Sequence, residues 1–115
     1  MIEKLPNVEH ATIQKAKITQ YLLNFDHEDG KTKADFFVRF GFEPDNWQAL
    51  EQALLQQATE NPVVQQTQTE FGVKYTIDGA LNCPDGRKPS IRTIWQIDKG
   101  KDTPRLITAH PDRLS

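Results

Sequence analysis

The spacing of apolar residues changes at Pro62, and this change constrains the fold more than any other feature of the sequence. Before Pro62, apolar residues recur every three or four positions, as Leu50 and Leu54 do, which predicts amphipathic helices. After Pro62 they recur at every second position, as Tyr75 and Ile77 do, which predicts half-buried strands. Helices followed by strands are typical of an α+β fold, in which the helices pack on one face of an antiparallel sheet.

The two halves of the chain can be divided further into individual elements. Helices are expected over residues 14–23, 31–40 and 45–61, and strands over 63–69, 71–78, 91–97 and 104–110, with a further short strand at 11–13. With 115 residues, the chain is long enough for one compact domain with its own core. We therefore predict a single domain over 1–115, with a helical half at about 13–61 and a sheet half at about 63–111. Its two or three helices would pack on one face of a three- to four-stranded antiparallel sheet.

Capping residues mark the predicted helix ends. Asp29 is placed to cap the second helix, because its carboxylate can accept hydrogen bonds from first-turn N–H groups. Gly41 is placed to end that helix in a left-handed conformation. Asp45, with Gln48 three residues later, predicts a capping box at the start of the third helix.

The alternation along the strands predicts which side chains share a face of the sheet. The face under the helices would carry Phe71, Val73, Tyr75, Ile77, Ile91, Thr93, Trp95 and Ile97. The opposite face would present Lys74, Thr76, Arg92, Ile94 and Gln96 to solvent or to a ligand. A register error of one residue would exchange the two faces.

Composition excludes several classes of protein. The formal net charge of −2 gives no indication of strong nonspecific binding to nucleic acid. The one cysteine, Cys83, has no cysteine partner for a disulfide, which fits a reducing compartment. No apolar run approaches the length of a membrane span, so we expect a cytoplasmic protein with no membrane partner. The three histidines lack the spacing of metal ligands, and no cofactor fingerprint is present, so we expect neither a metal nor a cofactor.

A set of short motifs, spread over nearly the whole chain, resembles the DUF6883 family of small bacterial domains of unknown function. In the first half the motifs are Leu5-Pro6-Asn7, Lys17, Tyr21-Leu22-Leu23-Asn24, His27, Gly30, Lys33-Ala34, Phe36-Phe37 and Gly41-Phe42. In the second half they are Phe71-Gly72, Lys74-Tyr75, Pro84-Asp85-Gly86-Arg87, Arg92, Trp95, Asp98-Lys99-Gly100, Pro104-Arg105-Leu106 and Thr108-Ala109. In element order and in the His…Gly…Lys loop, such domains are similar to small toxin nucleases of the barnase, EndoU, colicin and RelE type. The resemblance therefore implies helices that precede an antiparallel sheet whose open face cleaves RNA.

The chemistry of RNA cleavage selects candidate residues from these motifs. Attack by the 2′-OH requires a base, an acid and cations that offset the charge on the phosphate, and histidine suits the first two tasks. The catalytic candidates are His27 as general acid/base, with Lys33 and Arg92 on the phosphate. Additional contacts to substrate are assigned to Lys31, Lys74 and Arg105. The predicted function is a metal-independent, toxin-like ribonuclease whose partners are RNA and a cognate small protein of the antitoxin or immunity type.

Each assignment has a structural alternative. His27 can be an exposed or loop-ordering histidine, and Arg105 can form a salt bridge with a turn aspartate such as Asp98 or Asp102. The stem of Lys33 can pack on aromatic side chains, Lys31 can be an exposed surface residue, and Arg92 can belong to a solvated polar face. His110 stands where the resemblance leads us to expect tyrosine, so it receives no catalytic role. For the whole chain, the alternative is a non-enzymatic module whose open sheet face binds a partner protein, as one component of a two-protein cassette.

Overall fold

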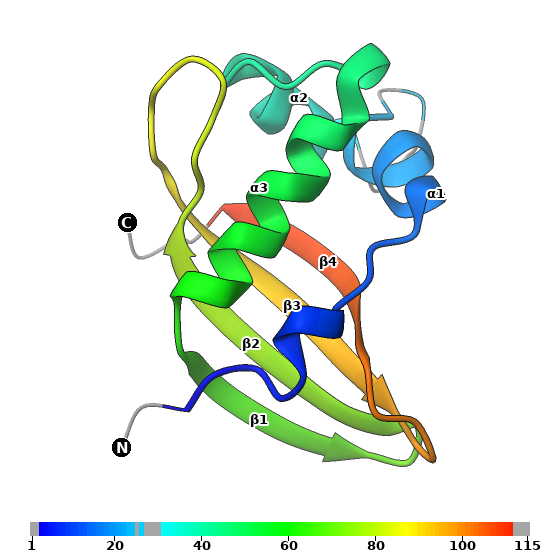
Figure 1. Cartoon of the computed structure of the whole chain (residues 1–115). Helices are drawn as coiled ribbons and strands as arrows, with labels where there is room; N and C mark the ends of the chain where they lie inside the picture. Colours follow the sequence, from blue (N-terminus) through cyan, green and yellow to red (C-terminus); the bar gives the residue numbers. More distant parts are fainter. Residues whose placement is uncertain (1–2, 25, 27–30, 112–115) are drawn as a thin grey trace.

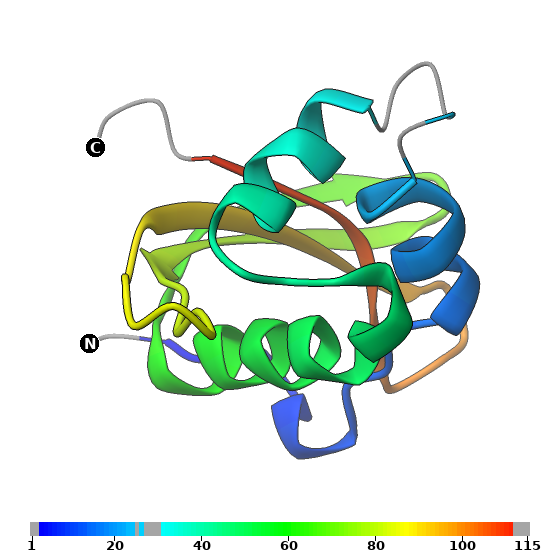
Figure 2. The ribbon, with the colours of Figure 1, turned by 90° about the horizontal axis from the view of Figure 1, so that it is seen from above.

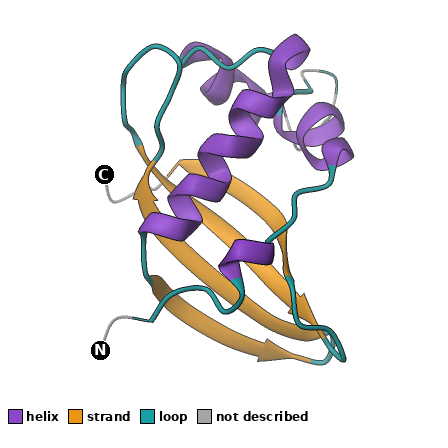
Figure 3. Cartoon of the chain, viewed as in Figure 1, coloured by secondary structure: helices purple, strands orange, loops and turns teal. Residues whose placement is uncertain are grey.

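The computed structural model describes residues 3–24, 26 and 31–111, and it has an α+β architecture with a helical layer on one sheet (Figures 1 and 3). The helical elements are η1 (Val8–His10), α1 (Lys15–Lys17), the π-helix η2 (Ile18–Leu22), α2 (Lys31–Arg39), η3 (Pro44–Asn46) and α3 (Trp47–Glu60). The strands are β1 (Val63–Thr69), β2 (Gly72–Ala80), β3 (Ser90–Asp98) and β4 (Pro104–Pro111). They form one antiparallel sheet in the order β1-β2-β3-β4, which confirms the predicted fold class.

Helix α3 covers one face of the sheet. In Figure 1, α3 crosses the front of the sheet, whereas α1, η2 and α2 lie at the upper end of the molecule, where α1 and α2 contact β4. Figure 2, seen from above, shows α3 to one side of the strands. The core between the layers includes Trp95 and Ile77 from the sheet, Leu50 and Leu54 from α3, and Phe37 from α2, all fully buried.

A buried polar network joins α3 to the two central strands. Gln57, near the end of α3, donates from Nε2 to the carbonyl oxygens of Ile77 at 3.2 Å and Ile91 at 3.1 Å. Its Oε1 accepts from the Thr93 hydroxyl at 2.9 Å, and that hydroxyl accepts from Trp95 Nε1 at 2.8 Å. The network supplies partners for the polar side-chain atoms of Gln57, Thr93 and Trp95 in a core where unpaired polar groups are costly.

The predicted division of the sheet into two faces holds for most positions. Tyr75, Ile77, Ile91, Thr93 and Trp95 are buried beneath the helices, as expected.

Two positions differ from the prediction. Phe71 precedes β2 in the turn after β1, so it lies outside the alternating strand and is 67% exposed. Gln96 does lie on the open face, but it is only 5% exposed, because it occupies the central strand between its cross-strand neighbours Lys74 and Arg105.

The end of α2 has the cap that Gly41 predicts. Gly41 adopts φ +104°, its N–H donates to Val38, and the N–H of Phe42 donates to Phe37. These two bonds form a Schellman motif, and the rings of Phe37 and Phe42, 6.2 Å apart at their centroids, supply its hydrophobic contact.

Other predicted helix ends and the short strand differ from the structure. Asp45 is not the cap of the third helix, because η3 extends the helical region by one turn and places Asn46 before α3. The predicted strand at 11–13 is reduced to a single parallel bridge between Thr12 and Arg105. Asp29 lies outside the described residues.

The Gln57 network leads to a stability prediction. Replacing Gln57 with leucine leaves the Thr93 hydroxyl without its acceptor and removes the amide donors to two carbonyls, so we expect a loss of about 1–3 kcal/mol in the free energy of unfolding. Urea denaturation of the wild type and Gln57→Leu measures the difference. Gln52→Leu, at an exposed position on α3, is the matched control and should change stability by less than about 0.5 kcal/mol. Equal stability of Gln57→Leu and wild type would contradict this account.

Candidate functional site

The face of the sheet opposite the helices carries three cross-strand rows of side chains from β2, β3 and β4. Residues directly opposite each other in antiparallel strands point to the same face, so the register defines each row. The rows are Asp78–Arg92–His110 at one end, Thr76–Ile94–Thr108 in the middle, and Lys74–Gln96–Arg105 at the other end. The middle row contains the Thr108 hydroxyl oxygen, which is buried and has no hydrogen-bond partner among the described residues.

A β-bulge in β4 brings Arg105 and His110 to the same face. Ile94 pairs with Thr108 and Trp95 pairs with Leu106, so Ile107 is an extra residue in β4. Without the bulge, two residues five positions apart in a strand would point to opposite faces.

Arg92 is held in position by Asp78. Its Nε and Nη2 donate to the two carboxylate oxygens of Asp78 at 2.7 and 2.8 Å. These hydrogen bonds lower the pKa of Asp78 from its ordinary value, against the opposing effect of burial, and the nearby His110 adds to the lowering. The two-point contact fixes the plane of the guanidinium next to His110, which lies directly across from Arg92 on β4.

A second arginine–carboxylate pair lies at the opposite end of the same face. Arg105 Nε and Nη2 donate to Asp98 at 2.7 and 3.1 Å, and Gln96 Nε2 donates to the same carboxylate at 2.6 Å. The hydrogen bonds from Arg105 and then from Gln96 lower the pKa of Asp98 to about 2. The pairing also raises the pKa of Arg105. The alternative interpretation of Arg105, as the salt-bridge partner of a turn aspartate, is therefore confirmed for Asp98.

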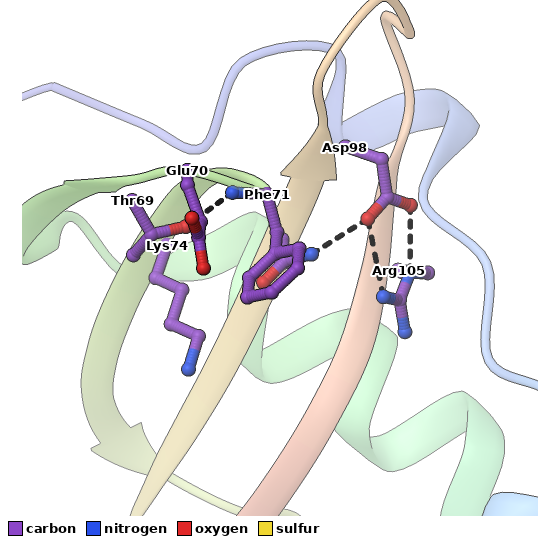
Figure 4. A pocket seen from close by; sticks show the side chains of 7 residues that line it. Thr69, Glu70, Phe71, Lys74, Asp98 and Arg105 are labelled. Atoms are coloured by element: carbon purple, nitrogen blue, oxygen red, sulfur yellow. Dashed lines mark hydrogen bonds and ion pairs between the residues drawn. The ribbon is translucent and has the colours of Figure 1, made fainter.

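An open pocket lies beside this second pair (Figure 4). It has a volume of about 550 Å³, and it is lined by Thr69, Glu70, Phe71, Lys74, Gln96, Asp98 and Arg105. Two residues predicted to bind substrate, Lys74 and Arg105, thus line one pocket although they are 31 positions apart in the sequence.

Lys33 lies on α2, away from the turn that joins β1 to β2. Its ammonium nitrogen is 5.3 Å from the centre of the Tyr21 ring, and Lys17 lies at the same distance from that ring. Both distances are within the range of cation–π attraction, so the Tyr21 ring interacts with two positive charges.

The loop between β2 and β3 anchors the C-terminal end of α2. Arg87 Nη2 donates to the Arg39 carbonyl oxygen at 2.8 Å, and the Arg87 guanidinium lies 4.2 Å from the centre of the Phe40 ring. Asp85 fixes Arg87 through a 2.6 Å bond to its Nε. A cation at the last carbonyls of a helix is electrostatically favourable, so this loop sets the position of the helix that carries Lys33.

Two candidates fall outside what the structure describes. His27 lies in the segment 27–30, and Lys31 begins α2 but its side chain is not described. The proximity of His27 to Lys33 and Arg92 therefore stays a prediction.

Comparison with known proteins places the chain in a family. The DUF6883 model, a domain of unknown function, matches residues 4–113. The chain belongs to the DUF6883 family. This membership confirms the resemblance carried by the sequence motifs.

One solved structure extends the comparison of the fold. A chain of the contact-dependent growth inhibition toxin–immunity protein complex from Klebsiella pneumoniae 342 aligns with a TM-score of 0.71 and 16% identity, over 92% of this chain and 97% of that chain. At this identity the alignment establishes a shared fold. No curated protein matches the sequence.

Sequence reasoning missed three residues of this face of the DUF6883 domain. Asp78 belongs to the same strand alternation as Lys74 and Thr76, so that pattern is sufficient to place it on this face. His110 was set aside, and its row with Arg92 depends on a bulge that alternation does not reveal. The alternation places Phe71 in the core, whereas the turn after β1 includes Phe71 and β2 begins only at Gly72.

Two further features bear on metal and membrane binding. Among residues 3–24, 26 and 31–111, no group of three or more His, Cys, Asp and Glu side chains could hold a metal ion. The metal independence of any reaction stays a prediction. No helix in the described part of the DUF6883 domain has the length and apolar character needed to cross a membrane.

The Asp98 pair leads to a prediction about pH. Removing the donors of Arg105 in Arg105→Met should raise the pKa of Asp98 from about 2 toward its ordinary value of 3.8. The pair stabilises the wild type fully above the unfolded pKa, and that contribution is lost as the pH falls from about 3.8 through about 2. The variant should therefore lose less stability than the wild type over this window.

An NMR titration of the aspartate side-chain carboxyl carbons measures these pKa values. Asp78 is an internal control in the same spectra, because its partner Arg92 is unchanged and its pKa should stay low. An Asp98 pKa that remains near 2 in Arg105→Met would show that Arg105 is not the main cause of the shift.

Proposed function

We propose that this DUF6883 domain is a toxin-like ribonuclease that cleaves RNA by 2′-OH attack without a metal ion. In this proposal His27 transfers protons as general acid/base, and Lys33 and Arg92 offset the charge that develops on the phosphate. Lys31, Lys74 and Arg105 bind neighbouring parts of the RNA. A cognate small protein of the immunity or antitoxin type would be the second partner.

The observation that carries the proposal is the position of Arg92. Its guanidinium lies on the sheet face opposite the helices, is oriented by two hydrogen bonds to Asp78, and is directly across from His110. A cation oriented in advance stabilises developing negative charge without rearrangement during the reaction. A second arginine and a lysine at the other end of the same face extend a polar surface along which an RNA backbone can run.

The fold comparison supports the same proposal at a coarser level. The chain of similar fold comes from a complex of a growth-inhibition toxin and an immunity protein, and the alignment covers nearly all of both chains. Fold similarity by itself does not transfer an activity, so the toxin role rests on the chemistry of the face.

A non-enzymatic protein-binding module is the second candidate. Arg92 and Arg105 are each paired with a carboxylate, and the formal net charge of the chain is −2. Binding to RNA derives much of its strength from phosphate contacts, and these pairs reduce the positive potential of the face. The same pairs suit a protein partner with mixed charges, such as the toxin bound by an immunity protein.

A cleavage assay separates the two candidates. The purified domain is incubated with end-labelled single-stranded RNA in EDTA, and products are tested for 2′,3′-cyclic phosphate ends. We expect cleavage by the wild type. His27→Ala should be slower by about 10²- to 10⁴-fold, the contribution typical of a general acid or base, and Lys33→Met and Arg92→Met should also lose most activity.

Matched controls separate chemistry from folding. His10→Ala and Lys99→Met remove an exposed histidine and an exposed lysine elsewhere on the chain and should retain wild-type rates. Thermal unfolding of every variant confirms that it is folded. Full activity in both His27→Ala and Lys33→Met would contradict the assignment of these residues to the active site. An absence of cleavage by the folded wild type would favour the protein-binding module.

A further inference from the structure

Phe71 is an exposed aromatic side chain on a fixed backbone. It follows Glu70 in the two-residue turn between β1 and β2, and it is 67% exposed. Its N–H donates to the Thr69 hydroxyl at 3.1 Å, and its carbonyl oxygen accepts from the N–H of Lys99 at 2.9 Å. The turn is therefore tied to its own strand and to the β3–β4 turn, so the ring projects from a rigid support.

The next residue, Gly72, locks the same turn against β3. Gly72 has φ +146°, and a Cβ at this position would collide with the carbonyl oxygen of Ile97. Only glycine permits this close approach of the two backbones. The backbone that carries the Phe71 ring is consequently held by the sheet.

The pocket next to the ring combines several kinds of binding group. Figure 4 shows the ring between the side chains of Lys74 and Arg105. Lys74 is exposed and has no ion-pair partner among the described residues, whereas Arg105 and Gln96 both donate to Asp98. Glu70 adds a carboxylate to the lining. The pocket thus offers an aromatic face, one unpaired cation, and polar groups of both donor and acceptor type.

We propose that this pocket is a nucleotide subsite for single-stranded RNA, in which a base stacks on Phe71 and a neighbouring phosphate contacts Lys74. The proposal rests on the proposed ribonuclease function, since the nucleotide belongs to the same RNA. In this proposal the substrate is held at the end of the sheet that carries Lys74. This end is two cross-strand rows away from Arg92.

The combination of groups favours a nucleotide over other occupants. Exposed aromatic rings beside a cation are the usual way in which proteins bind unpaired bases, since every base has a π-face and every nucleotide has a phosphate. The pocket volume of about 550 Å³ lies in the range of small-ligand sites. A purely apolar partner would displace water from the charged groups of Lys74 and Glu70 without replacing its hydrogen bonds.

The experiment measures binding of RNA that the domain cannot cleave. The probe is a fluorescein-labelled single-stranded hexamer of 2′-O-methyl ribonucleotides, which lacks the attacking hydroxyl, and affinity is measured by fluorescence anisotropy over a range of salt concentrations. Phe71→Ser should bind about 5- to 150-fold more weakly, as expected for loss of one base stack, with the salt dependence unchanged. Lys74→Met should instead reduce the slope of log K against log salt by about 0.7, the value for one phosphate contact.

Two control variants make the result specific. Phe71→Trp should retain or increase affinity because it keeps an aromatic face. Val64→Ser removes a second large exposed apolar side chain, 54% exposed on β1, and should bind as the wild type does. Because the Phe71 ring is exposed, Phe71→Ser should also keep the wild-type melting temperature.

The outcomes distinguish this proposal from the ribonuclease proposal. Wild-type affinity in Phe71→Ser, or no binding of the hexamer by the wild type, would overturn the subsite, and the exposed ring would then fit a protein partner. If RNA is cleaved but Phe71→Ser binds normally, only the subsite fails. If binding of the uncleavable hexamer depends on Phe71 but natural RNA is not cleaved, only the ribonuclease activity fails.

Discussion

The side-chain amide of Gln57 is the interaction on which the arrangement of the two layers depends. It bonds two carbonyls, one on β2 and one on β3, and it also accepts from Thr93, so one residue of α3 is in contact with both central strands. Apolar packing alone allows a helix to slide over a sheet, whereas buried hydrogen bonds with fixed geometry favour one position. With α3 held in this position, the polar rows of β2, β3 and β4 remain on the other face.

Much of the fold could be predicted from the sequence, because periodicity is a local property of the chain. The change of period at Pro62, the alternation through Tyr75 and Ile77, and the terminating Gly41 each depend on neighbouring residues. The wrong predictions depended on geometry that the local sequence does not determine. The 3₁₀ turn that includes Asp45 and the exact start of β2 after Phe71 both shift an element by one or two residues, which is enough to reverse the orientation of a side chain.

The candidate site was predictable as a face but not as a set of contacts. Alternation correctly placed Arg92, Lys74 and Gln96 on the side away from the helices. The pairing of Arg92 with Asp78, and the bulge that brings His110 beside it, require the register between strands that are distant in the sequence. Such long-range pairing is the part of a fold about which a single sequence contains least information.

Because Arg87 anchors α2 at its C-terminal end, a small tilt at the anchor produces a larger displacement at the other end of the helix. The anchor is at Arg39, and Lys33 lies six residues earlier, about 9 Å along the helix axis. A tilt of about 10° at the anchor therefore displaces the backbone at Lys33 by about 1.5 Å. A displacement of this size is sufficient to impair a positioned catalytic group, so in the proposed ribonuclease the Pro84–Arg87 loop would control the rate from a place that never touches the substrate.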